Sequence, residues 1–306
     1  MLALPGTDSP TDLTTFTVKA AGQDLGAEYG IVSIEIRREV NRVPKASIVM
    51  VDGDASEQTF ATSEEDTLLP GVEIEILGGY SKDEKTLFKG IVTRHRVEVG
   101  PGNRSRLSVE VRDPVFRMAI GRRSRNFVDV TDSDVIEQMI AFNQGVTADV
   151  ETTSLQHSQI VQHQVSDWDF LVMRAEMAGH AVICVDGKVQ CAPPAVAGTA
   201  AAAALFGQGL FSAELELDAE TQLTAVETAA WDQANQEAVT TESDDQPTPG
   251  PGDIKGADLA DTGGIGTALR HPGALDQAAL DQWAAAGMGR SRRSAVRGKV
   301  KIQGTE

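Results

Sequence analysis

The sequence predicts a mainly β protein with short helices. Three observations support this fold class: apolar and polar residues alternate in many short runs, turn residues separate the runs, and helical periodicity is confined to a few segments. The chain has 306 residues and 41% hydrophobic content, which is enough for two domains with buried cores. A chain of this composition is globular rather than disordered.

The first third of the chain contains closely spaced strands. Six runs alternate or are continuously apolar, and turns at this spacing predict a barrel or a sandwich. Gly78-Gly79 separates two of the runs and is interpreted as a turn, as is Gly263-Gly264, because neither pair has the Lys-Ser/Thr of a phosphate loop. The expected strands cover residues 13–20, 31–40, 46–52, 72–77, 87–99 and 106–113.

A capped helix occupies the centre of the sequence. Ser166 followed by Asp169 is a capping box, in which both side chains can accept hydrogen bonds from backbone N–H groups of the first turn. Asp167 and Asp169 also place negative charge at the positive end of the helix. Trp168 begins an apolar stripe at helical spacing, and Gly179 stands where a left-handed residue would end the helix.

A tight hairpin follows this helix. Strands over 181–185 and 188–192 flank Asp186-Gly187, a pair typical of a two-residue turn. With that turn, Cys184 and Cys191 share one face of the hairpin but lie diagonally, a poor geometry for a disulfide. We therefore expect two buried thiols.

The remaining elements are a mixture of helices and strands. Asp132-Ser133-Asp134 opens one helix, and Gly145 lies where it would stop. A segment rich in Pro, Gly, Asp and Ser, 240–256, is interpreted as a flexible surface loop. The other expected elements are strands over 158–165, 210–217 and 223–231 and a helix over 276–286.

The charge and the N-terminus restrict the function. The net charge is −18, which disfavours a nucleic-acid binder and favours a soluble protein with an acidic surface. No basic and apolar signal peptide opens the chain, so the protein is expected to begin in the cytoplasm. The longest run of low polarity, 195–206, is shorter than the roughly 20 residues that span a bilayer.

The sequence offers no catalytic, cofactor or metal-binding motif. The five histidines lack zinc-binding spacing, and His157 and His163 are interpreted as exposed polar residues of a strand. Asp167 and Asp169 lie in one helical turn and point in different directions, unlike the carboxyl pair of a glycosidase. They are interpreted as helix caps. There is no Gly-x-Ser-x-Gly elbow.

Two basic clusters stand out in this acidic chain. One interpretation is a solvated face or a helix end that favours cations. The other is docking to acidic partner surfaces, including neighbouring copies of the chain, and the second cluster supplies the candidate subunit contacts Arg290, Arg292, Arg293 and Arg297. Nucleic acid is disfavoured because no aromatic residues alternate with the cations. The clusters are Arg122, Arg123 and Arg125, and Arg290, Arg292, Arg293, Arg297, Lys299 and Lys301.

Several segments resemble one family. The segment from Ser166 to Gly179 is similar to the Ser-Asp-(aromatic)-Asp-Phe-Leu…Glu-x-x-Gly segment of VgrG-like proteins, the hub-and-spike proteins of contractile injection systems such as type VI secretion and contractile phage baseplates. Phe88-Lys89-Gly90-Ile91-Val92, with the later Asp113-Pro114, resembles the close of the first hub domain of that family. The stretch 289–305 resembles the final helix entering the spike barrel.

The resemblance implies a domain plan and partners. The expected domains are a first barrel-like hub domain (1–121), a helix and hairpin segment (122–200), a second barrel-like hub domain (201–296) and the start of an OB-like spike barrel (297–306). The implied function is a homotrimeric symmetry adaptor without enzymatic activity that joins a six-fold inner tube to a three-fold spike. The implied partners are a hexameric tube protein, baseplate wedge proteins, a spike-tip protein and effector cargo, with a target membrane reached only through the spike.

Two alternatives come from other classes of protein. A cell-wall or carbohydrate hydrolase within such a particle would need a further catalytic segment, and the resemblance already covers nearly all of residues 13–305. A glycan-binding β module would normally show clustered exposed aromatic residues, whereas only 5% of residues are aromatic. Assembly into a trimer or a larger particle would distinguish the hub from a monomer with affinity for sugars.

Overall fold

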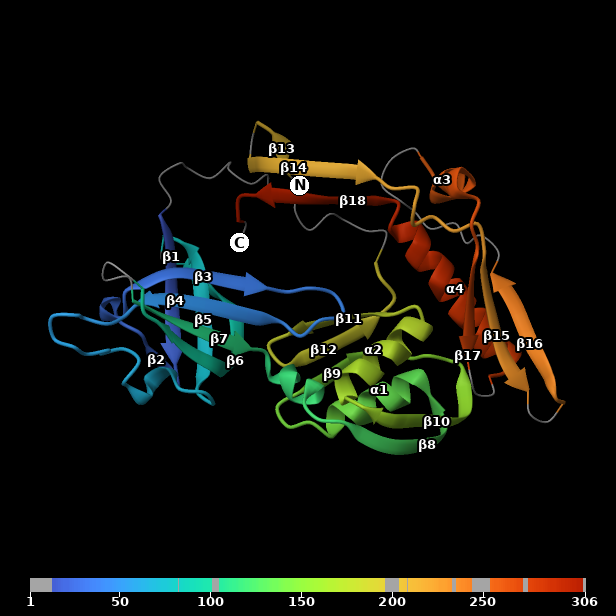
Figure 1. The fold of residues 1–306 in the computed structure, drawn as a ribbon, viewed down its shortest axis with the longest axis horizontal. Helices are drawn as coiled ribbons and strands as arrows, with labels where there is room; N and C mark the ends of the chain where they lie inside the picture. The colour runs from blue at the N-terminus through green and yellow to red at the C-terminus, as the bar shows by residue number, and fades with distance from the viewer. Residues whose placement is uncertain are drawn as a thin grey trace.

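The computed structural model describes residues 13–81, 83–100, 105–195, 204–207, 209–232, 235–243, 254–271 and 275–304. The fold is mainly β with few helices, as the sequence predicts. Figure 1 shows three parts along the chain: a first sheet, a middle body with two short helices, and a C-terminal part around one long helix. None of the helices in these ranges is long and apolar enough to cross a membrane.

The first part is one antiparallel seven-stranded sheet in the order β2-β1-β5-β6-β7-β4-β3. Its inner face buries aliphatic side chains from alternate positions, such as Ile48, Met50 and Leu107, each fully buried. No pairing among the described strands joins the edge strands β2 and β3. The strands are β1 (Thr14–Ala20), β2 (Gln23–Asp24), β3 (Ile31–Arg37), β4 (Lys45–Val51), β5 (Glu73–Tyr80), β6 (Asp83–Glu98) and β7 (Arg106–Arg112).

The interpretation of Gly78-Gly79 as a turn is wrong. Both residues lie inside β5, and that strand continues to Tyr80 before the chain reverses. Position 79 requires glycine for a different reason. A Cβ there would lie 1.8 Å from the backbone oxygen of Asp83 on the paired strand. The Gly263-Gly264 pair does end an element, since Gly264 is the left-handed C-cap of a helix.

The middle body packs two helices with two small sheets. Strand β8 pairs antiparallel with β10, and β12 lies between antiparallel β11 and parallel β9. One apolar core joins these elements, with Ile136 and Met139 of α1 and Leu171 of α2 fully buried. The elements are β8 (Arg123–Thr131), α1 (Asp132–Ala141), β9 (Thr147–Val150), β10 (Gln156–Val165), α2 (Asp167–Met177), β11 (Ala181–Val185) and β12 (Lys188–Ala192). Three short 3₁₀ helices precede them: η1 (Ala27–Tyr29), η2 (Asp66–Leu68) and η3 (Pro114–Ala119).

The C-terminal part has two three-stranded sheets. Helix α4 packs on the sheet β16-β15-β17, where Val226, Ala284 and Met288 form a small buried core. The other sheet has the order β13-β14-β18 and is drawn above the first sheet in Figure 1. The elements are β13 (Leu205–Phe206), β14 (Gly209–Leu217), β15 (Val226–Asp232), β16 (Glu237–Ser243), α3 (Gly256–Gly263), β17 (Thr267–His271), α4 (Gln277–Arg293) and β18 (Val296–Ile302).

Two predicted boundaries in this part are wrong. Helix α4 extends to Arg293 rather than 286, and Gly287 within it fits closely against the sheet: a Cβ on Gly287 would lie 3.1 Å from a methyl group of Val226. The predicted loop 240–256 begins inside β16, which pairs with β15 as far as Ser243. Residues 244–253 of that prediction lie outside the described residues.

Candidate functional site

Helix α2 begins at a side-chain cap. The Ser166 hydroxyl accepts a hydrogen bond from the Asp169 backbone N–H at 3.1 Å. The predicted return bond is different, because the Asp169 carboxylate accepts from the Ser166 hydroxyl at 2.6 Å instead of from a backbone N–H. The complete capping box is at α1, between Thr131 and Asp134. Trp168 points into the middle core and is 6% exposed.

The end of α2 is fixed by its backbone. Gly179 has a left-handed φ of +74°, and its N–H donates to the Glu176 carbonyl at 3.2 Å. The next N–H, of His180, donates to the Ala175 carbonyl at 2.8 Å. These two bonds form the Schellman arrangement that ends many helices at glycine. The chain then turns directly into β11.

The hairpin turn after α2 contacts the first sheet. Asp186 and Gly187 have φ angles of +51° and +83°, as a two-residue turn that follows strand twist requires. The Asp186 carboxylate accepts from the Lys89 backbone N–H of β6 at 2.9 Å. Gly187 also approaches the Gly145 carbonyl so closely that a Cβ would lie 2.8 Å from its oxygen. The turn therefore joins two parts of the molecule.

Asp113 forms the other half of this junction. It follows β7 and is 1% exposed, and its carboxylate accepts backbone N–H groups from Val115 and from Gly187, both at 3.0 Å. Burial raises the pKa of Asp113, although the two backbone hydrogen bonds act in the opposite direction. The Asp113-Pro114 motif thus holds the hairpin of the middle body against the end of the first sheet.

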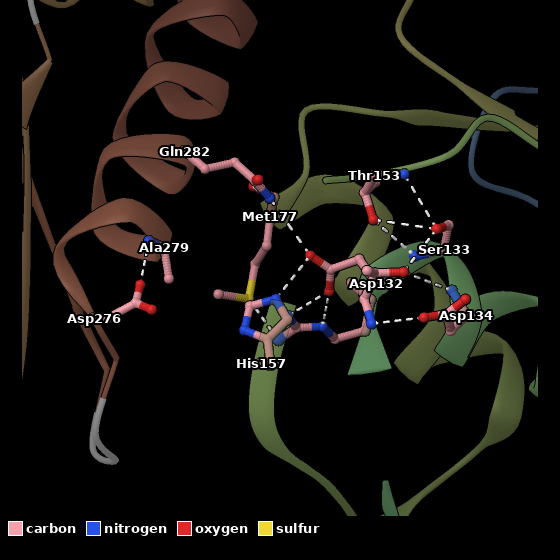
Figure 2. A network of polar contacts seen from close by, with 11 residues as sticks. Asp132, Ser133, Asp134, Thr153, His157, Met177, Asp276, Ala279 and Gln282 are labelled. Carbon is pink, nitrogen blue, oxygen red and sulfur yellow. Dashed lines mark hydrogen bonds and ion pairs between the residues drawn. The ribbon is translucent and has the colours of Figure 1, made fainter. Parts of the chain in front are cut away.

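A second buried aspartate links four elements of the middle and C-terminal parts (Figure 2). Asp132, at the start of α1, is fully buried, and its Oδ1 accepts from Arg174 Nε of α2 at 2.6 Å. His157 Nε2 of β10 lies 3.1 Å from the other oxygen, Oδ2. Gln282 of α4 reaches the same oxygen at 3.5 Å and the Met177 carbonyl at 3.4 Å. This network connects α4 to the middle body.

The electrostatics keep Asp132 ionised. Burial by itself would raise its pKa, but the hydrogen bond with His157 and the charge of Arg174 outweigh that effect and hold the pKa of Asp132 below its usual value. The interpretation of His157 as an exposed residue is wrong, since its side chain is 9% exposed against Asp132. His163 is exposed. Sequence reasoning missed Arg174, and the available signal was a cation three residues after Leu171 on the buried side of a helix.

A third buried aspartate starts α2. Asp167 is 2% exposed and forms ion pairs with Arg125 at 2.6 Å and Arg123 at 3.4 Å. Burial would raise the pKa of Asp167, but bonds from Gln162 and Arg125 hold it below its usual value. Two of the three arginines in the first basic cluster, Arg123 and Arg125, therefore pair with Asp167 of the same chain. Asp167 is an ion-paired core residue as well as a helix-end charge.

The second basic cluster is divided between surface and interior. Arg290 pairs with Glu176 of α2 at 3.4 Å, and Arg297 pairs with Asp218 at 3.1 Å. Arg293 lies on the surface at the last residue of α4. Arg292 is 8% exposed and donates to the Leu223 carbonyl at 3.0 Å. In this fold Arg292 is buried within its own chain, and the subunit contacts predicted for all four arginines stay predictions.

The buried groups of this site are structural in character. No cluster of three His, Cys, Asp or Glu residues suited to a metal occurs among the described ranges. Cys184 and Cys191 lie opposite Val189 and Val182 as predicted and are not bonded to each other. Burial raises the pKa of both thiols to about 12, so neither is a thiolate at neutral pH. The arrangement can fix elements relative to one another.

Two exposed features complete the candidate site. A groove of about 840 Å³ lies between α2, α4, β10 and β17, and Met173, His271 and Trp283 are among its lining residues. The second feature is the pair β14–β18, here called the ribbon, defined as residues 209–217 and 296–302. Its large apolar side chains are exposed, with Leu215 at 67% and Val300 at 56%. Both features are surfaces that a partner molecule could cover.

One family model matches nearly all of the chain. The model of the Alg8 N-terminal domain matches residues 10–306, almost the whole sequence. The chain belongs to this family. The family's name states no reaction and no substrate, and no curated protein matches the sequence.

Solved structures share the fold of the chain. A tail protein from Neisseria meningitidis MC58 covers 95% of the chain and 81% of its own length, with a TM-score of 0.63 and 13% identity. The 43 kDa tail protein of prophage MuSo2 from Shewanella oneidensis covers 95% and 83%, with a TM-score of 0.65 and 13% identity. A Francisella PdpA–VgrG complex covers 87% and 41%, with a TM-score of 0.50 and 10% identity.

These neighbours confirm the expected resemblance at the level of the fold. The chain is similar to phage tail proteins and to a VgrG-containing complex, as the sequence motifs predict. At 13% identity or less the likeness concerns the architecture of the fold.

Proposed function

We propose that this chain is the structural hub of a contractile injection particle, placed where the inner tube meets the spike. The observation that carries the proposal is the fold shared with two tail proteins over 95% of the chain. A match of that extent leaves little of the chain for an unrelated domain. The buried aspartates support a mechanical role, because each joins elements from different parts of the chain by ion pairs or backbone hydrogen bonds.

The proposed assembly is a homotrimer that adapts symmetry. Residues 1–121 and 201–296 would form two comparable β-rich hub domains, with 122–200 between them and 297–306 leading toward the spike. Three copies would then present six similar domains to a six-fold tube and one three-fold axis to the spike. Sheath contraction would pass force through this ring, and the chain would perform no covalent chemistry.

The fold suits force transmission at its two internal junctions. The Asp113 carboxylate holds the hairpin turn at Gly187, and the Asp132 network holds α4 through Gln282. In both places a buried aspartate takes part in the contact. The proposed partners are a hexameric tube protein, baseplate wedge proteins, a spike-tip protein and effector cargo. We propose that assembly begins in the cytoplasm.

The hydrolase and glycan-binding alternatives have less support. Asp132 and Asp167 are buried carboxylates of the middle body, and both are held by arginines of the same chain. A general acid would need a raised pKa, whereas the pKa of each of these two groups is lowered. The ion pairs therefore favour a structural use of these carboxylates.

Imaging of native particles tests the proposal. The chain would be tagged at its N-terminus in the organism that encodes it, and tail-like particles would be isolated and examined by electron microscopy with a tag-specific label. We expect label at one end of the tube, at the junction with the spike, and three copies for each particle. Label along the sheath, or particles that assemble normally without the chain, would contradict the proposal.

A further inference from the structure

The outer face of the first sheet carries three adjacent cations, here called the basic row and defined as Arg37, Lys45 and Arg112. Strand pairing places Lys45 of β4 between Arg37 of β3 and Arg112 of β7. The alternate residues Ala46 and Val111 face the core and are 1% and 0% exposed, so the basic row lies on the opposite face. Like charges directly opposite each other across strands destabilise a sheet. An anion over the basic row would relieve this repulsion.

The carboxylates beside the basic row leave donors unused. Glu35 accepts from Arg37 Nε at 2.7 Å, and Glu110 accepts from Arg112 Nε at 2.9 Å. Both bonds use the inner nitrogen of the guanidinium group, and the terminal nitrogens of these two arginines have no ion pair within the described ranges. The Lys45 ammonium likewise forms no ion pair with a described residue. The basic row therefore has donors available for a further anion.

The next row of the sheet does not neutralise this charge. There Glu35 and Glu110 share the face with Arg94 of β6. The two rows together hold four cations and two carboxylates, in a chain whose net charge is −18. Burial acts to raise the pKa of Glu110, but the hydrogen bond from Arg112 outweighs it and the pKa is lowered. The charges of Arg94 and Lys45 act in the same direction, so these cations converge on one carboxylate.

Exposure and composition narrow the kind of ligand. The Arg37 and Arg94 side chains are 55% and 66% exposed, whereas sites for small molecules bury most of the ligand. Neither row has an aromatic side chain on which a base could stack, and the net charge opposes a long polyanion such as nucleic acid. A protein surface with several carboxylates can contact both rows at once.

We propose that the basic row binds an acidic segment of a different protein, whose carboxylates bridge Lys45 and the two arginines. A guanidinium group can bind a carboxylate through two parallel N–H groups, which suits the terminal nitrogens of Arg37 and Arg112. A second copy of the chain fits less well, because two molecules with a net charge of −18 repel each other. The inference rests on the charges of the sheet and does not depend on the proposed hub.

Binding of a fluorescently labelled decaglutamate peptide to the purified full chain tests the proposal. Anisotropy is measured at about 0.15 M salt, where screening limits charge interactions to about 8 Å, so the peptide senses the basic row rather than the net charge. We expect Lys45→Glu to weaken binding at least about tenfold, because it places a like charge against the peptide. The control is Lys188→Glu, the same charge change at a cation that already pairs with Asp149 at 2.7 Å, and it should change binding less than about twofold.

Three results would overturn the proposal. They are absence of peptide binding by the unmodified chain, equal binding by the two variants, and tighter binding of a ten-nucleotide single-stranded DNA than of the peptide. Weaker self-association of Lys45→Glu than of Lys188→Glu would place a second copy on the basic row and would also contradict a different protein as partner.

Stability gives an independent readout. We expect Lys45→Glu to lower the equilibrium constant for unfolding about two- to fivefold in urea melts, because it puts an opposite charge between two arginines. Lys188→Glu removes an exposed ion pair and should raise that constant by about twofold or less. A clear loss of stability for Lys45→Glu would mean that acidic residues of the chain itself already cover the basic row, and the proposal would be wrong.

Discussion

The middle body and the ribbon both carry regularly spaced apolar residues, but these are buried in the middle body and exposed in the ribbon. In the middle body every large apolar residue of the α2 stripe faces neighbours of the same chain, and Leu171 is fully buried. In the ribbon the alternating residues of β14 are just as regular, yet Leu215 is 67% exposed. The comparison shows that a regular apolar pattern in the sequence predicts an apolar face on the helix or strand, but it does not predict whether that face is buried within the chain.

Polar groups differ between the two regions as well. The middle body buries Asp132 and Asp167, and each has a guanidinium partner in the same chain. The ribbon places its charges at the surface, where Glu214 and Lys299 lie across the strands from each other. Buried pairs are specific to one arrangement, whereas exposed pairs are weak and adaptable. The middle body therefore pairs its buried charges within the chain, whereas the ribbon leaves its charges in solvent.

The largest expected effect comes from breaking the Asp132 network. Asp132→Asn leaves the buried guanidinium of Arg174 without its counter-charge, and we expect a loss of about 3–5 kcal/mol of folding free energy. Urea melts of both proteins would measure it. The control is Asp134→Asn in the same helical turn, whose exposed side chain only caps the helix and should cost about 1 kcal/mol or less. Equal losses for the two variants would mean that Asp132 is no more than a cap.

One substitution made in both regions sharpens the comparison. Leu171→Ala should cost about 3 kcal/mol, because it removes a fully buried side chain and leaves a cavity. Leu215→Ala should change the unfolding free energy of the monomer by less than about 0.5 kcal/mol, because that side chain is already in water. Denaturant melts at a concentration where the chain is monomeric would compare them. A large loss for Leu215→Ala would show that the ribbon is covered within the chain.

Acid should weaken the middle body. The pKa values of Asp132 and Asp167 are lowered in the folded chain, so their stabilisation is present above the unfolded value of about 3.9 and is lost as the pH falls through the folded values. The pKa of Asp113 is raised, so its contribution is present below about 3.9 and is lost as the pH rises. Because two of these aspartates lose stabilisation on acidification and one gains it, urea melts from pH 7 to pH 3 should show a net loss of unfolding free energy. A rise in stability below pH 4 would reverse this assignment.

The smallest expected effect concerns the cap of α2. Ser166→Ala removes the hydroxyl that accepts from the Asp169 N–H and should cost about 1 kcal/mol. Ser158→Ala on β10 is a control at an exposed position and should be neutral within about 0.5 kcal/mol. The two melts should be compared at neutral pH. No difference between the variants would indicate that water replaces the cap without loss.

Local rules predicted much of the fold. The Asp186-Gly187 hairpin and its cysteine register follow from backbone angles and strand period, which depend on residues close in sequence. The long strands of the first sheet follow from alternation for the same reason. The length of α4 could not be predicted, because Gly287 is explained by close approach to Val226, 61 residues away by number. Tertiary contact there outweighs helix propensity.

The candidate site was harder to predict than the fold. Arg174 reaches Asp132 across 42 residues and His157 reaches it across 25, so no spacing rule joins them. Asp167 was assigned to its helix end, which is correct for its position, but its partner Arg125 is 42 residues away. Charged residues at predicted helix starts can be anticipated. Their burial and their partners depend on packing that only the folded chain defines.

The central proposal is that this chain assembles as a homotrimeric hub. The most direct measurement is the mass of the purified protein in solution by sedimentation equilibrium, from nanomolar to high micromolar concentration. The proposed hub predicts a reversible shift from one chain to three, with no stable dimer, because a three-fold ring closes only when it holds three copies. A monomer across the whole concentration range would contradict it.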